Sequence, residues 1–366
     1  FGSSSCRSLG RLILAMAPLW VGVFRSSSLC WRLGSRRYGR GLAGRGAGSR
    51  PLGDIKLEGQ THEANLRHLE RCRQRGAKLE TYFEKAVEKQ GWRSETVVVP
   101  RSAEHGGDVR VHLQTPVAGV AERLPLVVWL HGGGMTMMSA KDMSGANFLA
   151  SVSARLREPF CWASVEYTLA PEHKFPQAID DMIAATQALA EPAMAEKYAY
   201  DPAKIGVAGI SSGGLVAGHA ATRLSSAGLK LSFVSLLYPM VDARSTISRE
   251  DFGDIPTCPA SWIDWSWHAL LNADDAIEKP IPEERRREAS LLFADWAKLR
   301  GVPILNLLGT RDALRDEGAA LSEAVRSAGV DLDEVRAEGM HAVAHNFDTG
   351  AKDLVVGWWC RALAKK

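Results

Sequence analysis

The sequence predicts a doubly wound α/β protein with a mostly parallel sheet, and three observations support this fold class. Eight strand-like runs follow one another along the chain, and from the third onward most are continuously apolar, as strands buried on both faces are. Segments with apolar residues at helical spacing lie between these runs. A glycine-rich turn leads from the fifth run straight into a helical segment. Such alternation is typical of a parallel sheet covered by helices on both faces.

The individual elements follow from the spacing of apolar residues. Strands are expected at residues 96–99, 109–113, 126–130, 160–165, 205–210, 231–237, 304–308 and 332–337. Helices are expected within residues 175–189, after Leu215 and within residues 320–325. Nearer the N-terminus, residues 61–90 carry apolar side chains at spacings of three and four. This spacing predicts an amphipathic helix or a pair of helices.

Residues 1–53 differ in composition from the rest of the chain. They contain nine Arg, no Lys and no acidic residue; subtracting these charges from the net +3 leaves −6 on residues 54–366. The basic balance of the whole chain therefore gives no argument for nucleic-acid binding. The apolar run at 12–24 is too short to span a bilayer as a helix, and no longer one follows in the expected mature domain. We therefore expect no stable membrane insertion of that domain.

Two interpretations of this leader are open. The apolar run suits the core of a signal sequence, and the Ser-, Arg- and Gly-rich stretch after it resembles a transit peptide for import into a mitochondrion or plastid. The alternative is translated sequence upstream of the true start, which would leave the protein cytoplasmic. Under both interpretations residues 1–53 are a leader outside the fold, and the folded domain spans residues 54–366.

One connection between strands is too long for a simple crossover. About 60 residues separate Pro239 from Val302, where α/β units usually need far fewer. We interpret this stretch as a cap inserted over the carboxyl edge of the sheet. The six cysteines lie far apart, none with Cys-x-x-Cys spacing, and a chain of this length needs no disulfides, so we expect free thiols.

The strongest local signal is the pentapeptide Gly209-Ile210-Ser211-Ser212-Gly213, which lies between an apolar strand and a helical run. A serine on such a strand-to-helix turn is exposed at the sheet edge near a helix N-terminus, which favours a developing negative charge. Glycines flank it because the turn brings neighbouring backbone too close for a Cβ atom. A phosphate-binding loop would need a lysine that is missing here. Ser211, in frame with the glycines, is the predicted nucleophile.

A second glycine run supplies hydrogen-bond donors for the same reaction. The strand at 126–130 runs directly into His131 and three glycines. Hydrolysis of an ester needs N–H groups where the tetrahedral oxyanion forms, and lipases and esterases use such a loop for them. We expect the oxyanion hole to consist of the backbone N–H groups of Gly133, Gly134 and Ser212. His131 is expected to fix the loop rather than to act in catalysis.

The acid and base of the triad are expected after the last two strands, since the chain order in this fold is Ser, Asp or Glu, then His. Asp312 follows the strand at 304–308, whereas Asp316 and Glu317 have the character of a first helical turn. His341 follows the last strand directly. His345 lies four residues further on, but a His-x-x-x-His pair without the Glu of a zinc motif or a third ligand predicts no metal site. It is interpreted as a partly buried helix residue.

With these residues in place, the chain resembles the hormone-sensitive-lipase-like family of α/β-hydrolases over about residues 95–365. Four blocks occur in the family's order: residues 131–134, the segment YTLAPEHKFP at 167–176, residues 209–214, and residues 312–317 with His341. The resemblance implies an eight-stranded sheet and hydrolysis of carboxylic esters without a cofactor or metal. It also implies a helical cap built from residues of about 54–92 and 242–298.

The sequence departs from the family at four positions. Ile210 stands where the family usually has Asp, Thr168 where it has Arg, Leu291 where it has Pro, and Ala342 where Gly is common. These departures bear on rate and substrate range more than on mechanism. The change at Ile210 removes a charge beside the expected nucleophile.

The expected partner is a small-molecule ester of short to medium acyl chain. An acyl or alcohol pocket is one interpretation of the residues Trp262, Trp265, Trp267, Met135, Met137, Met138 and Met143, and ordinary packing is the other. Three other functions remain open. They are an amidase or arylformamidase, a lipase acting at membranes, and a ligand-binding member of the fold without activity.

Overall fold

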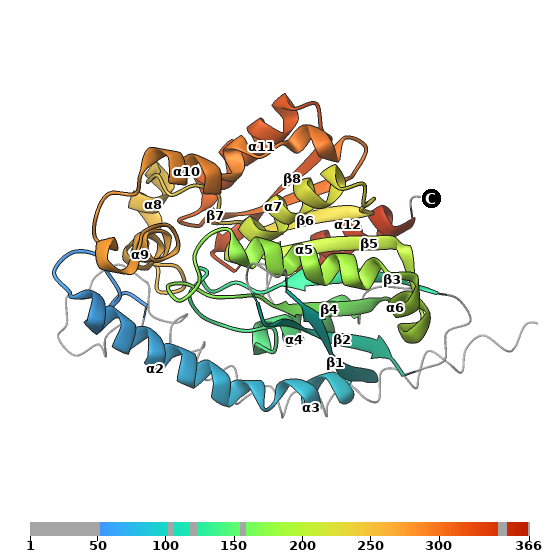
Figure 1. The fold of residues 1–366 in the computed structure, drawn as a ribbon. Helices are drawn as coiled ribbons and strands as arrows, with labels where there is room; N and C mark the ends of the chain where they lie inside the picture. The colour runs from blue at the N-terminus through green and yellow to red at the C-terminus, as the bar shows by residue number, and fades with distance from the viewer. Residues whose placement is uncertain (1–51, 102–105, 118–122, 154–158, 343–349, 365–366) are drawn as a thin grey trace, which may run out of the picture. The chain divides into compact units, whose positions relative to one another are not determined.

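A computed structural model describes residues 52–101, 106–117, 123–153, 159–342 and 350–364. Its centre is an eight-stranded sheet with the order β1-β2-β4-β3-β5-β6-β7-β8 (Figure 1). The strands are β1 (Trp92–Pro100), β2 (Asp108–Pro116), β3 (Leu124–Leu130), β4 (Cys161–Glu166), β5 (Tyr200–Ile210), β6 (Phe233–Leu237), β7 (Ile304–Arg311) and β8 (Leu332–Met340). Strand β2 pairs antiparallel with both β1 and β4, and the remaining pairs are parallel. All eight expected strands are therefore present, in a mostly parallel sheet.

Helices connect the strands and pack on both faces of the sheet. They are α2 (His62–Glu80), α3 (Phe83–Glu88), α4 (Met143–Ser153), α5 (Gln177–Ala190), α6 (Pro192–Tyr198), α7 (Ser212–Ser226), α8 (Ile247–Phe252), α9 (Ala260–Leu271), α10 (Glu283–Ala289), α11 (Arg315–Ser327) and α12 (Ala351–Ala364). The amphipathic segment near the N-terminus forms the pair α2 and α3. The long connection after β6 contains α8, α9 and α10 with short 3₁₀ turns between and after them.

The strand order places the carboxyl ends of β3 and β5 side by side at the centre of the sheet. From β3 the chain continues to β4 on one side, and it returns to form β5 on the other. The crevice outside such a reversal point is where open α/β sheets bind their ligands. Leu130, the last residue of β3, pairs with Gly209 of β5, so the loops after these strands begin next to each other.

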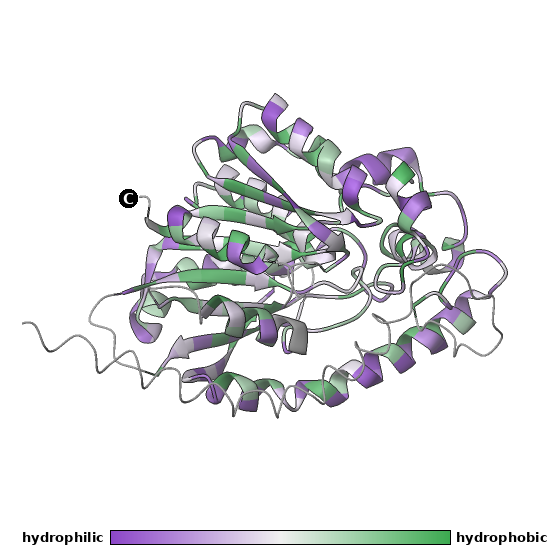
Figure 2. Cartoon of the chain, turned by 180° about the vertical axis from the view of Figure 1, so that it is seen from behind, coloured by the Kyte–Doolittle hydropathy of each residue, from purple (hydrophilic) through white to green (hydrophobic). Residues whose placement is uncertain are grey.

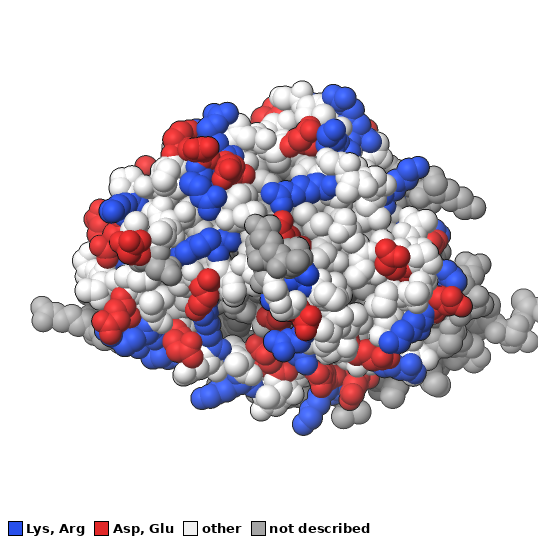
Figure 3. Space-filling model, in the orientation of Figure 1, with Lys and Arg blue, Asp and Glu red and all other residues white. Residues whose placement is uncertain are grey.

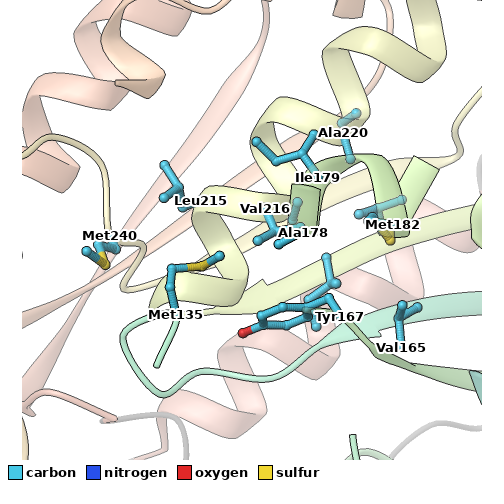
Figure 4. Packing of buried hydrophobic residues seen from close by; sticks show 14 of the residues in the cluster. Met135, Val165, Tyr167, Ala178, Ile179, Met182, Leu215, Val216, Ala220 and Met240 are labelled. Carbon is cyan, nitrogen blue, oxygen red and sulfur yellow. The ribbon is translucent and has the colours of Figure 1, made fainter. Parts of the chain in front are cut away.

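Two apolar layers hold the helices to the sheet. Alternate residues of β3 face opposite layers: Val128 belongs to the cluster with α5, α7 and the insertion after β6, and Trp129 belongs to the cluster with α3, α4 and α12. Side chains of a strand alternate between faces, so β3 contributes to both layers. Figure 4 shows the first layer near the end of β3, where Met135 lies beside Leu215 and Tyr167. The central strands are largely hydrophobic in Figure 2, whereas α2 alternates between polar and apolar residues.

Several of the tryptophans are part of the second layer. Trp129 lies 4.7 Å from Trp162 between ring centroids, and Trp162 lies 6.3 Å from Trp359. The described cysteines, Cys72, Cys161, Cys258 and Cys360, are free, as expected. Among the helices in the described ranges, none has both the length and the apolar character needed to cross a bilayer. Acidic and basic side chains are interspersed on the face seen in Figure 3.

Candidate active site

Ser211 lies on a sharp turn between β5 and α7. Its backbone has φ 53° and ψ −122°, a conformation that is strained for a residue with a side chain. A Cβ atom on Gly209 would lie 2.2 Å from the carbonyl oxygen of Gly213, and one on Gly213 would lie 2.3 Å from that of His131. Both glycines are therefore required by close backbone approach, which is the reason the sequence suggested for them.

The three side chains expected to form a triad lie within hydrogen-bonding distance of one another. His341 Nε2 is 3.0 Å from Ser211 Oγ, and His341 Nδ1 is 2.8 Å from Asp312 Oδ2. The other carboxylate oxygen of Asp312 accepts the Leu314 N–H at 2.9 Å. Ser211, Asp312 and His341 are all buried, with 7%, 1% and 8% of their surface exposed. The chain of contacts has the geometry in which a histidine takes the proton of a serine and a carboxylate holds its ring.

The glycine loop after β3 lies directly against this serine. A Cβ atom on Gly132 would lie 3.2 Å from Ser211 Cβ, and Gly133 and Gly134 have φ values of 108° and 62°, which favour glycine. Within the described residues, the N–H groups of Gly133, Gly134 and Ser212 have no hydrogen-bond acceptor. These three donors are free to bind a substrate oxygen beside Ser211.

The fold agrees with comparisons to known proteins. The model of the α/β-hydrolase fold family matches residues 127–348. The chain belongs to this family. A carboxylesterase of Mycobacterium tuberculosis is 31% identical over 232 residues, which cover 62% of this chain and 68% of that protein. An esterase structure from Pyrobaculum calidifontis has a TM-score of 0.66 and 27% identity, covering 81% of this chain and 92% of its own.

A further relative is a rat protein named neutral cholesterol ester hydrolase 1. It is 28% identical over 262 residues, which are 56% of this chain and 64% of that protein. The chain thus spans just under two thirds of this relative's length. The resemblance to hormone-sensitive-lipase-like α/β-hydrolases that the four blocks suggested is confirmed by these matches.

The surroundings of the four departures from the family pattern differ. Ile210 is buried in the layer with α3, α4 and α12, so an apolar side chain suits its surroundings. Ala342 has φ 66°, the left-handed conformation for which glycine is the usual residue, and it directly follows His341. Thr168 donates its N–H to Asp181 at 2.8 Å, a bond that the backbone makes whatever the side chain. Leu291 is fully buried and lies in a short 3₁₀ turn.

Burial and charge act in opposite directions on His341. Burial is the largest single effect and lowers its pKa, but the charge and hydrogen bond of Asp312, together with contributions from Cys258, raise that pKa well above its usual value. Cys258 lies beside the same imidazole, and burial raises the pKa of its thiol, which keeps it neutral. Tyr238 packs its ring edge against His341 at 5.0 Å. No sequence pattern pointed to Cys258. Tyr238 immediately follows β6, a position that could have singled it out.

His131 fixes the glycine loop, as expected. Its ring stacks on Tyr167 at 4.2 Å, and the Tyr167 hydroxyl donates to the His131 carbonyl at 2.7 Å. Burial lowers the pKa of His131 to about 4, so the ring is neutral at physiological pH. The segment at 167–176 therefore braces the loop that carries Gly133 and Gly134.

The tryptophans and methionines of the suggested pocket have different positions. Trp262 on α9 packs against the glycine loop, because a Cβ atom on Gly134 would lie 2.6 Å from its ring. Trp265 lies 6.2 Å from His62 of α2, and Trp267 is buried in the apolar core. Met135 and Met137 are buried and Met138 is partly exposed, whereas the Met143 side chain lies outside the described part. Trp262 is therefore in direct contact with the loop beside Ser211.

A buried ionic cluster near the site was not expected from the sequence. The sequence pattern predicted Glu317 in the first turn of a helix, and it lies in the first turn of α11. Its side chain is buried and accepts a hydrogen bond from the Arg249 guanidinium at 2.5 Å. Arg249 comes from α8 in the long insertion and also donates to Asp264 at 3.1 Å. Asp316, in the same turn of α11, accepts the Ser248 N–H at 2.8 Å and does not contact His341. Arg249 was missed because its partner lies 68 residues away.

No group of three or more potential metal ligands occurs among the residues that the structure describes. His345 lies in residues 343–349, which are outside the described residues. Residues 1–51 of the expected leader are also outside them.

Proposed function

We propose that this protein hydrolyses carboxylic esters of short to medium acyl chain, with Ser211 as nucleophile, His341 as general base and Asp312 as the acid of the triad. The observation that supports this most directly is the continuous chain of contacts from Ser211 Oγ through both nitrogens of His341 to Asp312, at 3.0 and 2.8 Å. Family membership and relatives named as esterases point to the same chemistry.

The steps follow from the positions of these groups. His341 Nε2 removes the proton of Ser211 as Oγ bonds to the ester carbonyl carbon, and the carbonyl oxygen becomes an oxyanion. The free N–H groups of Gly133, Gly134 and Ser212 stabilise that charge. His341 then gives its proton to the departing alcohol. Water, activated by the same imidazole, hydrolyses the acyl-enzyme and restores Ser211.

The acyl-chain preference rests on the covering of the site. Trp262 lies directly over the glycine loop, and both it and Ser211 are almost fully buried. A closed site of this kind favours small soluble substrates over lipid aggregates. The rat relative's name mentions cholesterol esters, so a sterol ester belongs in the substrate panel.

Amide hydrolysis is a second candidate because one relative points to it. A rabbit protein named arylacetamide deacetylase is 27% identical over 312 residues, covering 70% of this chain and 77% of its own. Acyl transfer from an amide uses the same triad, with an amine as the leaving group.

The test compares the wild-type chain with Ser211→Ala and Ser212→Ala on a panel of p-nitrophenyl esters of increasing acyl length, acetanilide, a cholesteryl ester and emulsified triglyceride. Removing Ser211 is expected to lower kcat/KM by about 10³-fold or more, as triad knockouts do. Ser212→Ala should retain substantial activity since it keeps its backbone N–H. Faster turnover of the anilide would favour the amidase, and faster turnover of the triglyceride a lipase. A wild-type protein that neither hydrolyses the panel nor reacts with a fluorophosphonate would refute the proposal in favour of a ligand-binding role.

A further inference from the structure

Arg73 of helix α2 is hydrogen-bonded to the loop that carries the expected oxyanion hole, and Glu80 at the end of the same helix accepts the Ser139 hydroxyl at 2.6 Å. Arg73 donates from Nε to the Thr136 carbonyl at 2.8 Å and from Nη2 to the Ala170 carbonyl at 2.9 Å. The two terminal nitrogens also donate to the two carboxylate oxygens of Glu172, Nη1 at 2.6 Å and Nη2 at 3.0 Å. These partners lie 63 to 99 residues away along the chain. A single guanidinium therefore joins three segments beside the site.

Both carbonyls that Arg73 binds belong to the frame of the glycine loop. The Thr136 N–H donates to the Gly133 carbonyl at 3.1 Å, and its hydroxyl bonds the same oxygen at 3.3 Å. The Ala170 N–H donates to the Met135 carbonyl at 2.8 Å. The orientation of the peptide units at Gly133 and Met135 is thus fixed by the two residues whose carbonyls Arg73 holds.

This loop needs such support because its backbone is strained. Met135 and Met138 have φ values of 63° and 70°, although neither is glycine. Residues with side chains are strained in this region and persist there when their surroundings fix them. Tyr167 supports the loop at His131, where the loop begins. Arg73 supports it at Thr136, beyond the glycines whose N–H groups are free.

We infer that Arg73 is a positioning residue for the oxyanion hole, so that α2 contributes to transition-state stabilisation through the Thr136 and Ala170 carbonyls. This inference rests on the proposed esterase function. A guanidinium suits the role because its donors lie in a fixed fork that can reach two carbonyls and a carboxylate at once. The ion pair with Glu172 is secondary, since the Glu172 side chain is 52% exposed and exposed pairs contribute little.

The experiment measures kcat and KM on a p-nitrophenyl ester for Arg73→Gln and Arg73→Lys in the full chain. Concentrations of active sites are set by the final extent of fluorophosphonate labelling. Two control variants accompany them. Arg71→Gln removes an exposed arginine of the same helix that contacts His68, and Glu172→Gln removes the ion pair but leaves both carbonyl bonds in place.

For Arg73→Gln we expect kcat to fall by about 10- to 100-fold per active site with KM nearly unchanged, because a small displacement of oxyanion donors has effects of this order. The affinity for a trifluoromethyl ketone, whose tetrahedral adduct places an oxyanion in the hole, should fall by the same factor as kcat/KM. The pH at which activity is half lost in acid should not move, since His341 keeps its contacts. Arg73→Lys should fall between wild type and Arg73→Gln, and both controls should stay within about 3-fold of wild type.

Three results would overturn the inference. One is a loss of labelled active sites or of thermal stability in Arg73→Gln with kcat per labelled site unchanged, which indicates a purely structural arginine. Another is an equal loss of kcat in Glu172→Gln, which assigns the effect to the ion pair. The third is a kcat per active site of Arg73→Gln equal to that of a wild-type enzyme that hydrolyses esters. If the wild-type chain neither labels nor turns over any ester, the proposed function fails first and this inference with it.

Discussion

The contacts of Asp312 allow the effect of a single isosteric change to be worked out. In Asp312→Asn an NH₂ group replaces one of the two carboxylate oxygens, and the neighbouring groups determine whether it takes the position of Oδ1 or of Oδ2. Oδ1 accepts the Leu314 N–H at 2.9 Å, so the amide oxygen must stay there and the NH₂ group must face His341 Nδ1. A donor in that place forces Nδ1 to accept. The proton of the neutral imidazole then sits on Nε2, which points to Ser211 and is no longer able to remove its proton.

The expected magnitude is a fall in kcat of about 10⁴-fold, the size found when this tautomer is imposed on a serine triad elsewhere. That factor corresponds to about 5.5 kcal/mol of lost transition-state stabilisation. The assay is steady-state hydrolysis of p-nitrophenyl butyrate at pH 8, with thermal unfolding as a check that the fold is intact.

Asp316→Asn is the matched control for this variant. Asp316 is four residues away and bonds Ser248 and Arg315 rather than His341, so its variant should keep kcat within about 3-fold. If Asp312→Asn retains more than a tenth of wild-type kcat, or if Asp316→Asn is the inactive protein, the assignment of the triad acid is wrong.

Three further predictions concern pH, the nucleophile turn and the buried ion pair. The pKa of His341 is raised, and the general base must be neutral to accept a proton, so kcat/KM should fall as pH drops through a midpoint above 6.5. A midpoint at or below 6.5 would contradict the raised pKa. Gly213→Ala places a Cβ atom 2.3 and 2.4 Å from two backbone oxygens, so the variant should lose activity, and its free energy of unfolding in urea should fall by at least about 2 kcal/mol. The control is Gly357→Ala, whose Cβ atom would have its nearest neighbour at 3.6 Å, and this variant should be as stable as wild type or more stable. Arg249→Met leaves Glu317 buried without its cation and should cost about 3–5 kcal/mol near pH 8. Adding Glu317→Leu should recover most of that loss, and a cost of Arg249→Met below about 1 kcal/mol would argue against the pairing.

The strands were predictable from sequence because most are buried on both faces. The residues at which they begin were not predictable. Residues 205–210 form the apolar part of β5, yet the strand begins at Tyr200, where Leu124 of β3 supplies a partner. Likewise β1 begins at Trp92 rather than at residue 96, since β2 pairs with it along its whole length. Such extensions are determined by the neighbouring strand, and a local pattern of apolar residues does not contain that information.

The same contrast applies to the site. The residues that the sequence pointed to all follow the carboxyl end of a parallel strand: Gly133 and Gly134 after β3, Ser211 after β5, Asp312 after β7 and His341 after β8. Since parallel strands end at one edge of the sheet, chain order alone brings these residues together. Arg73 and Arg249 come from segments outside the sheet and reach partners more than 60 residues away. No spacing rule connects an arginine on a peripheral helix to a carbonyl or a carboxylate in another segment.

The two peripheral segments hold different halves of the proposed machinery. Helix α8 binds the segment that follows Asp312: the Ser248 hydroxyl donates to the Ala313 carbonyl at 3.0 Å and accepts the Asp316 N–H at 3.1 Å. Helix α2 binds the glycine loop through Arg73. Lifting α8 from α11 would break the bonds that hold the turn next to Asp312, and would separate the Arg249–Glu317 pair in the same step. Lifting α2 would break the contacts of Arg73, the hydrogen bond from the Ser139 hydroxyl to Glu80, the ring contact between His62 and Trp265, and the packing of the helix's apolar face. Displacing α2 would therefore disturb the proposed oxyanion side of the site, and displacing α8 the side of the proposed acid.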